Sequence, residues 1–63
     1  MDLSPKVLLQ IAKENGWVLR RINGSHHIYK NPITGKSVPI PIHGNKDLKL
    51  GTFKAIQKEL ESK

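Results

Sequence analysis

The chain of 63 residues has no cysteine and only three aromatic residues, namely one Trp, one Tyr and one Phe. Without cysteine no disulfide bond can stabilise the fold, and such a composition fits a reducing cytoplasm. A domain of this size gains only about 3–5 kcal/mol of net stability from its core. We therefore expect one domain, residues 1–63, for which a partner protein would be a source of extra stability.

Long hydrophobic runs are also missing. No apolar stretch approaches the roughly 18 residues that span a bilayer. The first five residues contain an acidic side chain, Asp2, and the turn dipeptide Ser4-Pro5, which is unlike a signal peptide. We expect a cytoplasmic protein that does not associate with membranes.

Carboxylates are absent from the middle of the sequence. The five acidic residues all lie at or before Glu14 or at or after Asp47. The segment between Asn15 and Lys46 contains all three histidines, and the net charge of the chain is +6. The segment contains four basic residues, Arg20, Arg21, Lys30 and Lys36, and it ends at a fifth, Lys46. Such an uneven distribution favours a polyanionic partner, most simply nucleic acid.

Helical signals mark both ends of the chain. Ser4 is a good N-cap and Pro5 a good first residue for a helix over residues 4–15. Near the C-terminus, apolar residues recur at helical spacing and predict a second helix. That apolar stripe consists of Leu50, Phe53, Ile56 and Leu60. The last five residues, 59–63, are expected to fray.

The segment between the helices predicts three β-strands, over residues 17–22, 26–31 and 36–42. The Asn23-Gly24 dipeptide is typical of a hairpin turn between the first two. Pro39 and Pro41 lack amide donors, so the third strand should lie at an edge of the sheet. The predicted fold class is therefore α+β, with the order α-β-β-β-α. A three-stranded antiparallel sheet would carry both helices on one face and leave a basic face open.

The run Gly24-Ser25-His26-His27 opens the second strand. Histidine titrates close to neutral pH, so it can exchange protons with a substrate. Successive strand residues point to opposite faces, so the two histidines cannot share one task. His26 shares a face with Ile28 and Lys30, whereas His27 shares the other with Tyr29. If Ile28 were buried, His26 would face the helices; we expect Tyr29 to be buried and His26 to lie on the open face.

Several further residues could support chemistry on a phosphate. Arg21, Lys30 and His43 are candidates for binding RNA or stabilising charge in the transition state. Strict alternation would allow only one of Arg20 and Arg21 to line the open face. The adjacent histidines diverge and no cysteine is present, so we expect neither a metal site nor another cofactor.

Five short motifs follow one another along the chain: Gly16-Trp17, Gly24-Ser25-His26-His27, Pro41-Ile42-His43-Gly44, Lys46-Asp47-Leu48 and Gly51-Thr52. In this order and spacing they resemble the HicA toxins of prokaryotic toxin–antitoxin systems. The resemblance implies a fold similar to double-stranded-RNA-binding domains. It also implies a type II toxin that cleaves mRNA independently of the ribosome and is neutralised by a HicB-type antitoxin. In that family the functional histidine follows Gly-Ser, which makes His26 the catalytic candidate, with His27 as the alternate and Gly24 and Ser25 as motif residues.

Three functions are compatible with these features. The preferred hypothesis is a metal-independent endoribonuclease, monomeric alone and hetero-oligomeric with its antitoxin. The second is a non-catalytic RNA-binding module of the same fold. The third is a protein-interaction domain whose basic face binds an acidic partner.

Overall fold

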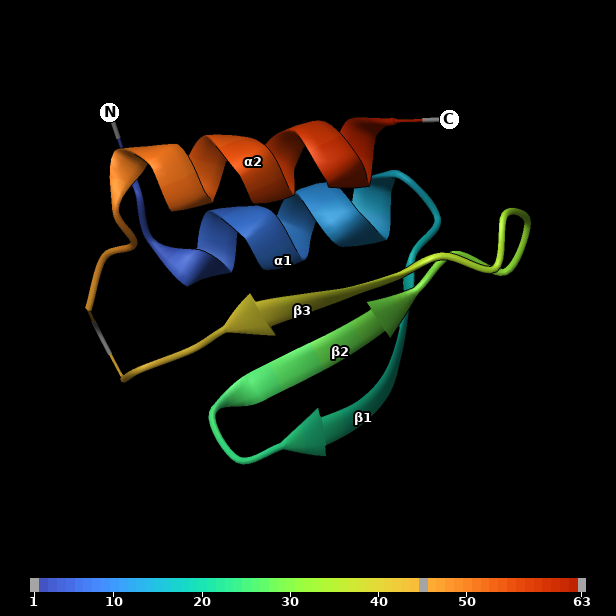
Figure 1. Ribbon diagram of the computed structural model, residues 1–63, viewed down its shortest axis with the longest axis horizontal. Coiled ribbons are helices and arrows are strands. Elements are labelled where there is room, and N and C mark those ends of the chain that lie inside the picture. The colour runs from blue at the N-terminus through green and yellow to red at the C-terminus, as the bar shows by residue number, and fades with distance from the viewer. Residues whose placement is uncertain (1, 45, 63) are drawn as a thin grey trace.

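The computed structural model describes residues 2–44 and 46–62. It contains helix α1 (Pro5–Glu14), strands β1 (Val18–Asn23), β2 (His26–Lys30) and β3 (Ser37–Pro41), and helix α2 (Leu50–Glu61). The strands form one antiparallel sheet in the order β1-β2-β3. This arrangement confirms the predicted α+β class and the α-β-β-β-α order (Figure 1).

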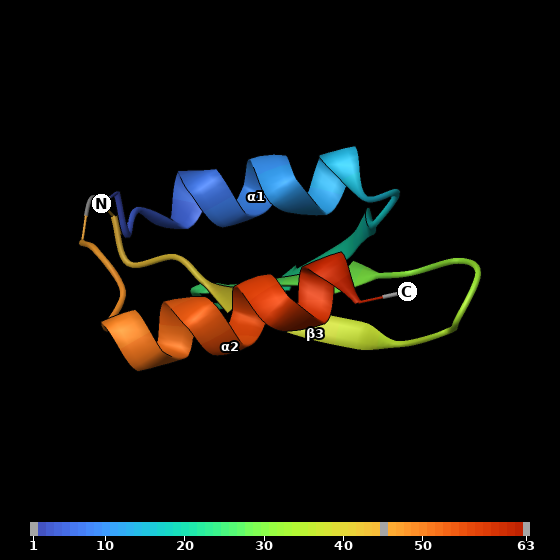
Figure 2. The ribbon, with the colours of Figure 1, turned by 90° about the horizontal axis from the view of Figure 1, so that it is seen from above.

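Both helices cover the same face of the sheet, as Figures 1 and 2 show from two directions. Each helix packs against the other and against β3. Trp17 and Tyr29 are each only 4% exposed, so the expected burial of Tyr29 is confirmed. The buried apolar core comprises Leu8, Ala12, Trp17, Tyr29, Val38, Ile40, Phe53 and Leu60.

The N-terminal helix begins where the sequence predicts. The Ser4 hydroxyl accepts a hydrogen bond from the Lys6 amide at 3.2 Å, and Pro5 occupies the first turn. Asn15 caps the other end. Gly16 follows with a φ of 81°, a conformation that glycine adopts without steric cost. Only Asn15 and Gly16 therefore separate the end of α1 from Trp17.

The predicted hairpin turn connects β1 and β2, and its loop begins one residue after Asn23. Asn23 is the last residue of β1 and pairs with His26, so Gly24 and Ser25 alone form the loop. Gly24 has a φ of 60°, and no non-glycine residue among the described ones has a positive φ. A positive φ at the first loop residue alone is the pattern of a type II′ turn rather than the type I′ turn that Asn-Gly suggests. Gly24 therefore sets the start of β2 and the position of His26.

Strand β3 is an edge strand, as its two prolines predict. The Ile42 amide donates to the Ser25 carbonyl at 2.6 Å. Amides alternate in direction along a strand, so those of residues 40 and 42 face β2 while Pro39 and Pro41 occupy the outward positions. The prolines thus cost the sheet no hydrogen bond, and the chain after β3 stays attached to the β1–β2 turn.

Two expectations for α2 are wrong. Residues 59–61 do not fray as predicted, because α2 continues to Glu61 and Leu60 is fully buried; residue 63 lies outside the described residues. The Trp17 indole Nε1 donates to the Leu60 carbonyl at 2.8 Å and holds this end of the helix. Leu50, placed in the apolar stripe, is 47% exposed because it is the first residue of the helix. Within residues 2–44 and 46–62, neither helix is long and apolar enough to cross a membrane.

Candidate nucleic-acid interface

The sheet face opposite the helices presents His26, and the strand register identifies its neighbours. His26 lies between Asn23 of β1 and Pro41 of β3. Directly opposed residues in an antiparallel sheet share a face, so all three belong to the open face. The same rule assigns two further rows to this face: Arg21, Ile28 and Pro39, and then Val18, Lys30 and Ser37.

The two adjacent histidines have different surroundings. His26 is exposed, whereas His27 is half-buried and pairs with Ile22 and Ile40. The His27 Nδ1 atom is buried and has no hydrogen-bond partner among the described residues. Since Tyr29 is buried on the His27 side, the expected outward direction of His26 is confirmed. Of these two histidines, only His26 has an imidazole that is free to meet a large substrate on the open face.

The expectation that only one of Arg20 and Arg21 lines the open face is wrong. The pairing of β1 with β2 shifts between Leu19 and Arg21, which leaves Arg20 as an extra residue in a β-bulge. A bulge interrupts the alternation of side chains. Arg20 and Arg21 consequently line the same shallow hollow, together with Ile28, Lys30 and Ser37. Nothing in the sequence marks a bulge at this position, so Arg20 was missed as a site residue.

The basic residues of the face lie at different distances from His26. Arg21 is a diagonal neighbour across the β1–β2 pair, within reach of a long side chain. Lys30 lies four residues further along β2, about 13 Å away at roughly 3.3 Å per residue. Arg21 could therefore contact a phosphate bound at His26, whereas Lys30 is placed for another part of an extended polyanion.

His43 lies beside His26 although 17 positions separate them in sequence. Their ring centroids are 6.4 Å apart, and the ring planes meet at 81°. The bond from the Ile42 amide to the Ser25 carbonyl brings the segment after β3 against the turn that precedes His26. Both imidazoles are exposed. Two motifs singled out in the sequence, Gly24-Ser25-His26 and Pro41-Ile42-His43-Gly44, thus form one site.

The charges around the sheet are distributed unevenly. Lys36 Nζ lies 3.9 Å from Glu59 Oε1 of α2, and both side chains are about half exposed. Such exposed pairs contribute at most about 1 kcal/mol. No salt bridge involves Arg20, Arg21 or Lys30 in the described part of the chain. These three cations are free to bind an anion.

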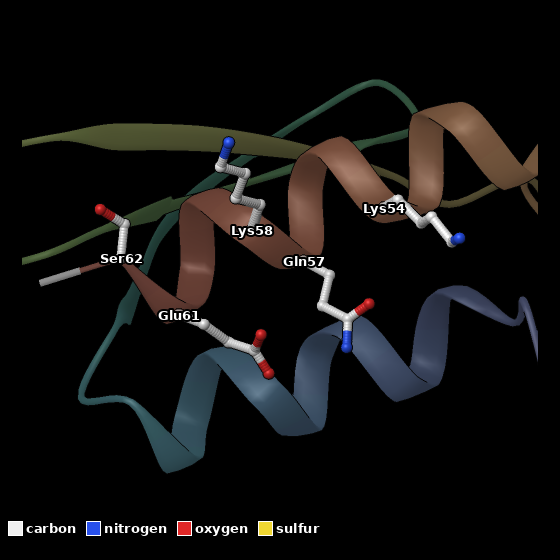
Figure 3. A pocket seen from close by; sticks show the side chains of 5 residues that line it. All are labelled: Lys54, Gln57, Lys58, Glu61 and Ser62. Carbon is white, nitrogen blue, oxygen red and sulfur yellow. The ribbon is translucent and has the colours of Figure 1, made fainter.

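Metal-ligating side chains and the surface of α2 are the other places where a site could form. Across residues 2–44 and 46–62, no three His, Cys, Asp or Glu residues are grouped closely enough to hold a metal ion. An open hollow along α2 is lined by Lys54, Gln57, Lys58, Glu61 and Ser62 (Figure 3). Gln57 and Glu61 extend towards α1 in this view, and the hollow contains none of the predicted site residues.

Comparison with known proteins gives one family. A family model described as the HicA toxin of bacterial toxin–antitoxin matches residues 5–61, which include both helices and all three strands. A search of curated proteins returned no match to the chain.

Proposed function

Because the chain belongs to the HicA toxins of bacterial toxin–antitoxin systems, we propose that it is an endoribonuclease that cleaves mRNA. The observation that carries this proposal is the exposed His26 imidazole on an open sheet face with Arg20, Arg21 and Lys30. In this role the protein acts in the cytoplasm, independently of the ribosome and of metal ions. Its RNA lies across the open face.

The proposed reaction uses a nucleophile that RNA itself carries. His26 accepts the proton of a ribose 2′-hydroxyl, and the 2′-oxygen attacks the adjacent phosphorus. The bond from phosphorus to the 5′-oxygen breaks, which yields a 2′,3′-cyclic phosphate and a 5′-hydroxyl end. A positioned general base typically accelerates such a step by about 10²–10⁴-fold. The Arg21 guanidinium, a diagonal neighbour of His26, stabilises the negative charge that develops on the phosphoryl oxygens.

Membership of a toxin–antitoxin family implies a protein that neutralises the toxin. We propose that a HicB-type antitoxin covers the open face and excludes RNA from His26. An antitoxin with carboxylates opposite Arg20 and Arg21 would complement the charge of this face and associate rapidly.

The test compares His26→Ala with His27→Ala in purified protein, using end-labelled RNA as substrate. We expect His26→Ala to slow cleavage by about 10²–10⁴-fold and to relieve growth arrest in cells. His27→Ala, compared per folded molecule by circular dichroism, should cleave RNA because its imidazole faces the helices. Retained cleavage by His26→Ala would refute the catalytic assignment.

Two further conditions separate the ribonuclease from other functions. Replacing the ribose 2′-hydroxyl at the cleaved position by hydrogen should abolish the reaction, and excess chelator should leave it unchanged. Tight, salt-sensitive RNA binding without any cleavage product would instead establish the non-catalytic RNA-binding module.

A further inference from the structure

The proposed ribonuclease reaction needs a second proton-transfer group. When the bond between phosphorus and the 5′-oxygen breaks, the leaving oxygen takes the electron pair and needs a proton. His26 cannot both hold the proton from the 2′-hydroxyl and have supplied one to the opposite side of the phosphate in the same step. A general acid on the other side of the phosphate would fulfil this requirement.

We propose that His43 is this general acid and that His26 and His43 act as a base–acid pair; this inference rests on the proposed ribonuclease function. Their centroid separation of 6.4 Å is longer than a direct hydrogen bond between the rings would allow. The space suits a reacting group between them.

The backbone explains how His43 reaches this position. Pro41 pairs with His26 across β2 and β3, and Ile42 donates to the Ser25 carbonyl. His43, two residues after Pro41, continues the alternation that places Pro41 on the open face. The Lys46 amide donates to the His43 carbonyl at 3.1 Å, so the chain turns immediately after the histidine. The imidazole is therefore held beside His26 by main-chain hydrogen bonds on both sides.

Other titratable side chains near His26 do not fit the acid role. Arginine does not release its proton in proteins, which eliminates Arg20 and Arg21. Lys30 is about 13 Å along the strand from His26. His27 and Tyr29 occupy the opposite face, and Tyr29 is buried. Among these groups, His43 is the one whose side chain lies beside the His26 imidazole.

Every proton that moves in the proposed reaction has a donor and an acceptor. His26 takes the 2′-hydroxyl proton while protonated His43 donates a proton to the 5′-oxygen as its bond to phosphorus breaks. Hydrolysis of the cyclic phosphate reverses both roles: His43 removes a proton from water, and His26 protonates the departing 2′-oxygen. Each histidine thereby returns to its starting state.

The experiment uses two matched RNA oligonucleotides that contain a mapped cleavage site. In one of them sulfur replaces the 5′-bridging oxygen at that linkage. A thiol is a much stronger acid than an alcohol, and that of cysteine has a pKa of about 8.5, so a thiolate departs without a general acid. We expect His43→Ala to slow cleavage of the oxygen substrate by about 10²–10⁴-fold and to cleave the sulfur substrate nearly as fast as the unaltered protein. His26→Ala should be slow on both, because the 2′-hydroxyl still needs a base.

Several outcomes would overturn the assignment. Equal slowing of His43→Ala on both substrates would indicate a phosphate contact or a structural role. Full activity of His43→Ala on the oxygen substrate would also refute it. So would restored cleavage of the sulfur substrate by His26→Ala. His27→Ala is the matched control and should show the substrate preference of the unaltered protein. If the unaltered protein cleaves no RNA when the site is being mapped, the ribonuclease function itself is refuted.

Discussion

At the scale of single residues, the direction of a side chain decides which chemistry is possible. His26 and His27 are identical in type and adjacent in sequence, yet one is exposed on the open face and the other is half-buried. His27 pairs with Ile22 and Ile40 across the sheet, and its buried Nδ1 has no hydrogen-bond partner among the described residues. The same alternation brings Arg21 towards the His26 side.

Arg21→Gln should weaken RNA binding in a salt-dependent manner. Each phosphate contact to a single strand contributes about 0.7 to the slope of log K against log salt. With His26→Ala as the background to prevent cleavage, we expect Arg21→Gln to reduce the slope by about that amount. Fluorescence anisotropy across a salt series measures it. Lys54→Gln, on α2 away from the sheet face, should leave the slope unchanged; an unchanged slope for Arg21→Gln would remove this residue from the interface.

At the scale of elements, side-chain hydrogen bonds define the connection between β2 and β3. Asn31 is 8% exposed, and its Oδ1 accepts from the Ile33 amide at 2.8 Å and from the Thr34 amide at 3.3 Å. The Asn31 backbone also pairs with Lys36 and Gly35. The turn residues in the sequence predict a loop here, and the asparagine side chain gives it one conformation.

Asn31→Ala should therefore destabilise the protein. The Ile33 and Thr34 amides would lose their acceptor, and a typical hydrogen bond contributes about 0.5–1.5 kcal/mol. Urea unfolding followed by circular dichroism measures the change in free energy. The matched control is Ile33→Ala in the same loop, where the side chain is 92% exposed and the expected change is within about 0.5 kcal/mol. Equal effects of the two substitutions would contradict this role for Asn31.

At the scale of the whole molecule, the helices cover the sheet unevenly. Both pack on β3, whereas β1 lies furthest from them in Figure 1 and all six of its residues are exposed. Val18, Leu19 and Ile22 of this strand are 42–58% exposed. Because β1 adds little to the core, contacts between segments that are distant in sequence must supply much of the stability. One of them is the bond from Trp17 to Leu60, which joins residues 43 positions apart.

Trp17→Phe tests this long-range contact. It retains an aromatic ring but leaves the Leu60 carbonyl without its donor, which should cost about 1–3 kcal/mol. In a domain of this size each kcal/mol lowers the melting temperature by about 4–8 °C. Thermal unfolding is followed by circular dichroism, because the substitution removes the only tryptophan. Leu50→Ala, at an exposed position, should change the melting temperature little; a similarly small change for Trp17→Phe would show that the bond is dispensable.

The sequence by itself determined the order of elements, the edge position of β3 and the identity of the family. These features depend on local signals, namely the Ser4-Pro5 cap, the periodicity of apolar residues and the missing proline amides, together with ordered motifs. It also predicted that His26 and Lys30 share a face, because a regular strand alternates by two.

Only the tertiary structure decided the remaining features of the site. The bulge at Arg20 breaks the alternation and adds this residue to the basic face, and it arises from pairing with β2 rather than from a local signal. The bond from the Trp17 indole to the Leu60 carbonyl in the last turn of α2 joins residues far apart in sequence. The 6.4 Å approach of His43 to His26 likewise depends on the register of β3 against β2. Strand pairing and long-range packing are properties of the folded chain, so no local pattern could specify these three outcomes.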